Sequence, residues 1–317
     1  MPVNPDLSVI VVTHNGRERA LATLRSALAA TGPIQAEWIV VDSGSGDGTP
    51  DAIERELPLV RVVRCANRGF AAANNVGLRL ACGRHLLLLN PDVDIARGSL
   101  AELVSAMDER PCVGLASVIQ LCPEGDLQHS IRRFPSFLRD LGEALFAARW
   151  PVLATLQELE TRAERYEREL SVDWVVGAFL LARREAVEAV GPMDEGFFLY
   201  SEEVDWCYRF HRAGWDVRHL PLMTIVHHAG RRDRSDLMAE LAHSRRRFAL
   251  KHHGHLGSIP IRSALVLGHC VRITSLLCLA ATGRPTAPRV RCEARALAVA
   301  LGLSAPPSLR WRTASTG

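Results

Sequence analysis

"LLLLNPDVD", residues 86–94, joins four leucines to two carboxylates that stand one residue apart. A continuous apolar run of this kind is typical of a strand buried on both faces of a parallel sheet. Similar β-branched runs occur at 7–13, 37–42 and 59–64, and segments with helical periodicity separate them. The repeated alternation predicts an α/β fold with a mostly parallel central sheet flanked by helices.

Polar side chains follow these predicted strands where each one ends. In sheets of this type, ligands bind beyond the carboxyl ends of the strands. Asp92 and Asp94 lie there, two residues apart, and their oxygens suit Mg²⁺ or Mn²⁺ that is held also by substrate phosphates. A solvated turn after Pro91 is the alternative interpretation.

A second acidic group lies in "LYSEEVDWC", residues 199–207. Glu202, Glu203 and Asp205 fall within one turn of a predicted helix, where mutual repulsion raises the pKa of at least one of them. A carboxylate of that kind can act as a general base. Acids are also common at helix starts for structural reasons.

Composition and charge narrow the class of protein. The eight cysteines among the 317 residues form no C-x-x-C pair, and no signal peptide is evident, so we expect reduced thiols in a cytoplasmic protein. Residues 231–317 hold 15 Lys and Arg against 4 Asp and Glu. This basic tail predicts an anionic partner, either a phospholipid surface or a lipid pyrophosphate, and no motif supports nucleic acid. A tail that only serves solubility in an arginine-rich protein is the alternative.

The segment 261–281 is apolar for about the length of a membrane span. Arg262, His269 and Arg272 form one polar stripe on a helix built from it. We expect this helix to lie in a membrane interface with the stripe toward the lipid headgroups. A helix packed against the rest of the chain or against a second copy in a homodimer is the alternative.

Several motifs, taken together, resemble glycosyltransferase family 2, whose fold is GT-A. They appear in the family's order across residues 7–230, and the likeness is greatest to bacterial rhamnosyltransferase-like enzymes. The matching stretches are "VIVVTHNG", "VDSGSGDGT", "NRGFAAANNVGL", "LLLLNPDVD", "WVVGAFLLARREA", "GPMDEGFFLYSEEVDWCYRFHRAGW" and "IVHHAG".

The resemblance implies a role for each matching residue. The nucleotide and donor sugar would contact Thr13, Asn15, Asp42, Ser43, Asn67, Gly69, Phe70, Asn74 and Asp92. The metal, Mg²⁺ or Mn²⁺, would be held by Asp94, Asp92 and His227. The acceptor would contact Trp174, Gly177, Ala178 and Glu202. Glu203 would be the catalytic base, and Asp205 is the second candidate.

The resemblance also implies an inverting transfer of a sugar, with rhamnose favoured, from a dTDP- or UDP-linked donor. The acceptor would be a hydroxyl of a glycan or lipid-linked glycan in bacterial cell-wall or surface polysaccharide synthesis. A sugar-phosphate nucleotidyltransferase and a non-catalytic sugar-nucleotide-binding module are the alternatives.

The expected organisation is a catalytic domain over 1–230 and a basic helical extension over 231–317. Within the domain, 1–120 would bind the nucleotide sugar and 121–230 the acceptor. Such an enzyme would lie peripherally on the inner face of the cell membrane.

Overall fold

The computed structural model describes residues 4–145, 156–228 and 234–309. Within them, nine strands form one sheet in the order β3-β2-β1-β4-β10-β6-β11-β5, with β8 beside β11. The first four are β3 (Val60–Arg64), β2 (Ala36–Asp42), β1 (Leu7–Thr13) and β4 (His85–Leu89). The others are β10 (Phe179–Arg183), β6 (Val113–Leu121), β11 (Asp216–His227), β5 (Val93–Arg97) and β8 (Leu170–Ser171).

The sheet is mostly parallel, as the sequence predicts. β3, β2, β1, β4, β6 and β11 run in one direction, while β10, β5 and β8 run in the other. β10 inserts between β4 and β6, so the segment after residue 121 contributes a strand to the centre of the sheet. β11 is one long strand with a register shift between His219 and Thr224.

Helices cover both faces of the sheet, because successive strand residues point to opposite sides. One face of β1 and β4 packs on α1 (Arg17–Ala29), α2 (Thr49–Glu56) and α4 (Leu100–Asp108). The other face packs on α3 (Phe70–Leu80), α6 (Arg184–Val190) and α7 (Glu202–Arg212). The four leucines of β4 are divided between the two cores, which explains their uninterrupted run.

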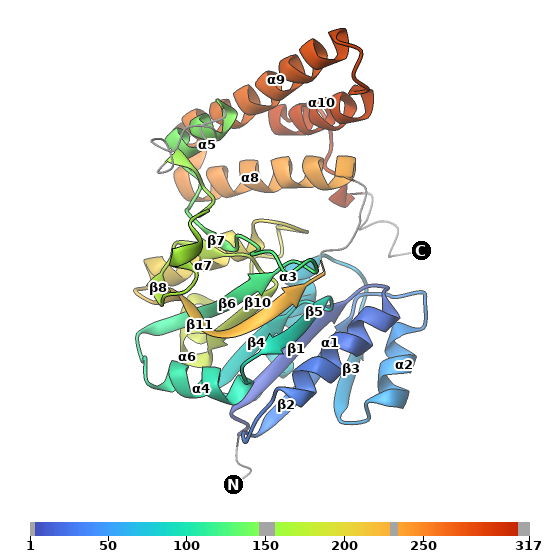
Figure 1. The fold of residues 1–317 in the computed structure, drawn as a ribbon, viewed down its shortest axis with the longest axis vertical. Coiled ribbons are helices and arrows are strands. Elements are labelled where there is room, and N and C mark those ends of the chain that lie inside the picture. Colours follow the sequence, from blue (N-terminus) through green and yellow to red (C-terminus); the bar gives the residue numbers. More distant parts are fainter. Residues whose placement is uncertain (1–3, 146–155, 229–233, 310–317) are drawn as a thin grey trace.

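The remaining elements form a separate helical layer beyond one edge of this core (Figure 1). It contains α8 (Arg234–Gly257, kinked at Gly254), α9 (Ile259–Ala281) and α10 (Ala287–Leu301). Helix α5 (Phe137–Ala144) lies beside α9, and a two-stranded sheet of β7 (Ile131–Arg132) and β9 (Trp174–Val175) leads toward it. The domain boundary expected at residue 230 lies outside the described residues.

Candidate active site

The residues predicted to contact the donor lie where β1 and β2 end. Thr13 and Asp42 are register partners there, and both are buried. One oxygen of Asp42 accepts a hydrogen bond from the Ser45 backbone N–H at 2.9 Å. Its other oxygen and the Thr13 hydroxyl are buried and have no partner among the described residues. A ligand that hydrogen-bonds both groups would satisfy them, since buried polar atoms are rarely left unpaired.

The loop after β2 is tied to the loop after β1. Ser43 donates its backbone N–H to the Thr13 carbonyl at 2.8 Å. Asn15, in a left-handed conformation (φ 53°), donates its backbone N–H to the Ser45 hydroxyl and accepts from the Gly46 N–H through its side-chain oxygen. The loop therefore forms a fixed rim beside Asp42.

Asp47 reinforces this rim, although the sequence analysis did not single it out. Its carboxylate accepts the Gly16 N–H at 2.7 Å and the Thr49 hydroxyl at 2.5 Å. The bond from Thr49 and those from backbone N–H groups hold the pKa of Asp47 well below its usual range, against the opposing effect of burial. Its position two residues before Thr49, which begins a predicted helix, is the feature of the sequence that could have indicated this role.

The start of α3 approaches residue 198 closely. Gly69 has φ 104°, and a Cβ there would lie 2.5 Å from the Phe198 carbonyl oxygen, so only glycine fits. The neighbouring Phe70 N–H donates to that oxygen at 2.8 Å. Asn67 accepts the Gly69 N–H through its side chain, and the buried Asn74 donates to the Phe70 carbonyl. These predicted donor residues are thus brought against the segment that leads into α7.

Asn75 fixes that segment, and the sequence analysis missed it. Its side-chain amide donates to the Met193 carbonyl at 2.9 Å and accepts the Met193 N–H at 3.0 Å. The segment ends at Tyr200 and Ser201, which both have positive φ (69° and 64°) immediately before Glu202. Two consecutive left-handed residues that are not glycine are strained, and such strain is characteristic of functional sites.

The two aspartates after β4 have different surroundings. Asp92 faces His227, whose Nε2 lies 3.4 Å from its Oδ1, an oxygen without a hydrogen-bond partner among the described residues. Asp94 instead contacts Arg19 at 3.2 Å and His228 Nε2 at 2.8 Å. The predicted trio of Asp92, Asp94 and His227 is therefore split, because Asp92 lies beside His227 while Asp94 pairs with His228. The antiparallel pairing of β5 with β11 places the two neighbouring histidines beside different aspartates.

The surroundings of His227 suit a cation. Its Nδ1 lies 3.1 Å from the side-chain oxygen of Gln128, and this pairing makes Nδ1 the donor. Nε2 then presents a lone pair toward the carboxylate of Asp92. Two acceptors that face each other need a cation or a proton between them, and a histidine whose other nitrogen donates to an amide oxygen is typical of metal ligands. Gln128 was not predicted, because nothing in its local sequence marks it.

The acidic start of α7 contains the strongest candidate for a base. Glu203 is partly buried, and its Oε2 has no partner among the described residues. Burial raises the pKa of Glu203 to about 7. Burial, together with the charge of Glu203, also raises the pKa of Glu202 well above its usual value.

Asp205 is engaged on all sides, unlike Glu203. Its fully buried carboxylate contacts Arg209 at 2.9 Å, Lys251 at 2.6 Å and His252 at 2.8 Å. Burial raises its pKa, but the hydrogen bonds from His252 and Lys251 outweigh burial and lower it overall. The geometry therefore places Asp205 in a structural network, and it favours Glu203 as the base.

The predicted acceptor-side residues link Glu203 to the aspartates. A Cβ on Gly177 would lie 3.6 Å from the Cβ of Glu203, so this backbone runs directly past the Glu203 side chain. The next residue, Ala178, accepts the backbone N–H of Asn90 at 3.0 Å, two residues before Asp92. Residues 177 and 178 thus place Glu203 beside the end of β4.

Trp174 packs against Arg132, which was not predicted from the sequence, and the two side chains form one wall of the site. Its indole N–H donates to the Arg133 carbonyl at 2.9 Å, and the Arg132 guanidinium lies 5.4 Å from its ring centroid. The charge of Arg132 lowers the pKa of Glu203 and so opposes part of the effect of burial.

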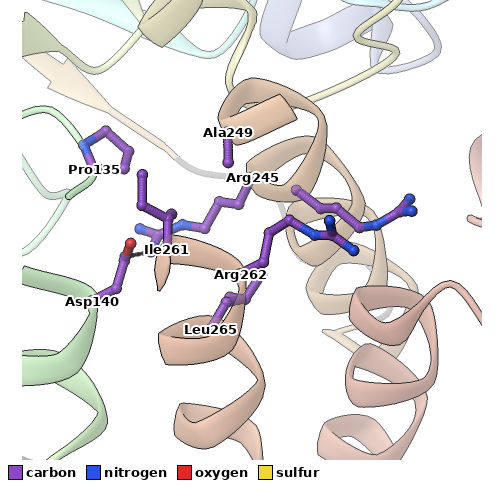
Figure 2. A pocket seen from close by; sticks show the side chains of 8 residues that line it. Pro135, Asp140, Arg245, Ala249, Ile261, Arg262 and Leu265 are labelled. Carbon is purple, nitrogen blue, oxygen red and sulfur yellow. Dashed lines mark hydrogen bonds and ion pairs between the residues drawn. The ribbon is translucent and has the colours of Figure 1, made fainter. Parts of the chain in front are cut away.

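Asp140, Glu143 and Glu158 form a separate acidic cluster, close enough together to hold a metal. Arg245 already lies among them, 3.7 Å from Glu143 and 2.5 Å from Glu158. It also lies 3.3 Å from Asp140 (Figure 2). The charge of Glu158 raises the pKa of this arginine, while burial raises the pKa of Asp140 to about 7. The cluster therefore anchors α8 to α5 and is not an open metal site.

Comparison with known proteins identifies the family of the chain. The model of the family described as Glycosyl transferase family 2 matches residues 8–191. The chain belongs to glycosyl transferase family 2. The family match and the curated relatives confirm that the chain is a glycosyltransferase and that it is rhamnosyltransferase-like.

Two curated relatives are named as rhamnosyltransferases. The N-acetylglucosaminyl-diphospho-decaprenol L-rhamnosyltransferase of Mycobacterium tuberculosis is 32% identical over 255 residues, which cover 74% of this chain and 80% of the relative. The rhamnosyltransferase WbbL of Escherichia coli is 25% identical over 176 residues, which cover 53% of this chain and 63% of the relative.

Solved structures confirm the GT-A fold. The mannosyltransferase PcManGT from Pyrobaculum calidifontis, in complex with GDP-Man and Mn²⁺, has a TM-score of 0.58 and 19% identity. The match covers 99% of this chain and 85% of that one. GalNAc-T7, solved with UDP, GalNAc and Mn²⁺, has a TM-score of 0.53 and 14% identity, and the match covers 81% of this chain and 52% of that one.

Proposed function

We propose that this glycosyltransferase transfers rhamnose, with inversion, from a dTDP- or UDP-linked donor to a hydroxyl of a lipid-linked glycan. Its setting would be bacterial cell-wall or surface polysaccharide synthesis on the cytoplasmic side of the membrane. The names of the two rhamnosyltransferase relatives support the sugar, and one of those names supports a diphospholipid-linked acceptor. The observation that carries the proposal is a carboxylate with a raised pKa, Glu203, placed by Gly177 beside the donor-binding end of the sheet.

The chemistry is a single displacement. The carboxylate of Glu203 takes the proton from the acceptor hydroxyl, and the hydroxyl oxygen forms a bond to the anomeric carbon. The bond from that carbon to the donor diphosphate breaks with its electron pair, and the nucleoside diphosphate leaves. The oxygen enters opposite the leaving group, so the anomeric configuration inverts. Holding both substrates in this alignment supplies much of the rate.

We propose that Asp92 and His227 hold the Mg²⁺ or Mn²⁺ ion. The unpaired oxygen of Asp92 and the lone pair on His227 Nε2 fit a hard or borderline cation that is also bound by substrate phosphates. When bound, such an ion would neutralise the charge that develops on the departing diphosphate. Asp94, which pairs with Arg19 and His228, would order this edge of the site.

The two neighbouring glutamates offer a test of the proposal with a matched control. Glu203→Gln removes the base and keeps the shape of the side chain, so turnover should fall by about 10²-fold or more while donor binding persists. Glu202→Gln makes the same chemical change one residue away and leaves Glu203 in place, so it should retain near wild-type turnover. Turnover would be followed as nucleoside diphosphate release and as mass of the glycosylated acceptor.

Other outcomes would identify the alternatives. Formation of a sugar nucleotide from a sugar phosphate and a nucleoside triphosphate would indicate a nucleotidyltransferase. Donor binding without transfer to any lipid-linked acceptor would indicate a binding module. Equal turnover of Glu203→Gln and wild type would place the base elsewhere.

A further inference from the structure

Helix α9 has an exposed face without charged side chains. It lies farthest from the sheet in the helical layer (Figure 1). Residues spaced three or four apart are exposed along it, and we call them the outer face of α9: Ile259, Ser263, Leu267, Cys270, Thr274, Leu277 and Cys278. Leu267 and Leu277 are 40% and 54% exposed. By length and apolar composition, α9 is also the one helix of the described residues that could cross a membrane.

The polar stripe of α9 points into the protein, which reverses the sequence-based expectation. His269 is buried and lies 2.7 Å from Glu293 of α10, and Arg272 contacts the same carboxylate at 3.1 Å. Arg262 lines a small pocket with Arg245 of α8 (Figure 2). The expectation that the stripe faces headgroups is therefore wrong. Polar groups inside and apolar groups outside are what a helix against hydrocarbon shows.

The charges around this face favour an anionic surface over a second copy of the chain. In the described part of the extension, residues 234–309, each of the three acidic side chains is either buried or paired with an arginine. Asp236 pairs with Arg295, and Glu240 and Glu293 are buried. Arg284, Arg289 and Arg291 are exposed and pair with no acidic side chain among the described residues. Two copies would bring positive charge against positive charge, whereas anionic lipid complements it.

We propose that the outer face of α9 docks into the headgroup–acyl boundary of an anionic bilayer, whose negative charge attracts the exposed arginines of the extension. The helix would lie along the surface, because a crossing would carry the ion pair of Arg272 and Glu293 into hydrocarbon. This inference does not depend on the reaction proposed above, and its tests use no turnover. A failure of one is therefore distinguishable from a failure of the other.

Native cysteines provide a direct test on the full chain. Cys270 and Cys278 lie on the outer face, while Cys82 and Cys112 are exposed on the catalytic core. Vesicles of phosphatidylglycerol and phosphatidylcholine in equal parts should slow alkylation of the first pair by a water-soluble maleimide by about tenfold. Alkylation of the second pair should stay unchanged, and pure phosphatidylcholine should protect much less. If neither vesicle type changes the alkylation rate of Cys270 and Cys278 relative to that of Cys82 and Cys112, the proposal is overturned.

Substitutions of exposed leucines distinguish the loss of docking by α9 from the effect of a change in net charge. Leu267→Asp with Leu277→Asp should weaken vesicle flotation by about tenfold or more, since two apolar side chains are lost from the interface. Leu59→Asp with Leu222→Asp adds the same charge at residues that are 81% and 44% exposed elsewhere, and it should bind like wild type. Equal loss in both variants would refute docking by α9. Thiol protection without vesicles, reversed on dilution, would show that a second copy covers the face instead.

Discussion

The raised pKa of Glu203 predicts how the reaction depends on pH. A free glutamic acid titrates near 4.5, whereas burial raises the pKa of Glu203 to about 7. The base works only when it is deprotonated, so kcat/KM should rise with pH on its acidic side and level off above about pH 8. At pH 6 about a tenth of the enzyme would carry an ionised base if the pKa is about 7, against nearly all of it for an unshifted glutamate.

The assay is initial-rate kinetics from pH 5 to pH 9 at saturating metal, with circular dichroism at each pH to confirm the fold. Wild type should lose roughly tenfold in kcat/KM per pH unit below pH 6, and Glu202→Gln should keep that acidic limb. The residual rate of Glu203→Gln should lack it. A profile that is flat between pH 5.5 and pH 8 in the wild type would refute the reasoning, because no base with a raised pKa would then limit the reaction.

Three further predictions concern the donor side and the buried acids. A nucleoside diphosphate with Mn²⁺ should stabilise the wild type by about 2.7 kcal/mol at a ligand concentration of 100 times Kd. Asp92→Asn should abolish this stabilisation in a thermal melt, whereas Asp94→Asn should keep most of it. Loss of the stabilisation in Asp94→Asn but not in Asp92→Asn would assign the metal to Asp94 instead. Gly69→Ala should cost about 2–4 kcal/mol of unfolding free energy, because the new Cβ meets backbone and φ is positive. The control Gly125→Ala also has positive φ but open space, so urea melts should show a loss of about 1 kcal/mol, and equal losses would contradict the packing argument. A raised carboxyl pKa costs stability once pH exceeds the unfolded value, so Glu202→Gln should raise Tm at pH 8 by about 2 °C or more and leave it unchanged at pH 4. A Tm gain at pH 4 as large as that at pH 8 would show that the raised pKa of Glu202 is not the cause of the gain.

The parallel half of the sheet could be predicted because its signals are local. Each apolar run of the first 90 residues became one strand, and β1 matches its predicted range of 7–13. Polar residues at strand ends were found for the same reason, since the carboxyl ends of parallel strands meet at one edge. The position of β10 between β4 and β6 depends on pairing across about 90 residues, which local periodicity cannot report.

The details of the site depended on tertiary contacts. Gln128 and Arg132 carry no motif, and their partners His227 and Trp174 are distant in sequence. The polar stripe of α9 was correctly identified as a stripe, but its direction depends on Glu293, which lies on another helix. A helical pattern shows which residues share a face, and only the packing shows which way that face points.

The anomeric configuration of the product tests the inverting displacement directly. Time-resolved ¹H NMR would follow wild-type enzyme with a sugar nucleotide donor, a glycan diphospholipid acceptor and Mn²⁺. We expect a new glycosidic linkage whose anomeric configuration is opposite to that of the donor, formed one for one with released nucleoside diphosphate. A linkage with the donor's own configuration would exclude the proposed mechanism, because a single displacement with Glu203 as base cannot retain it.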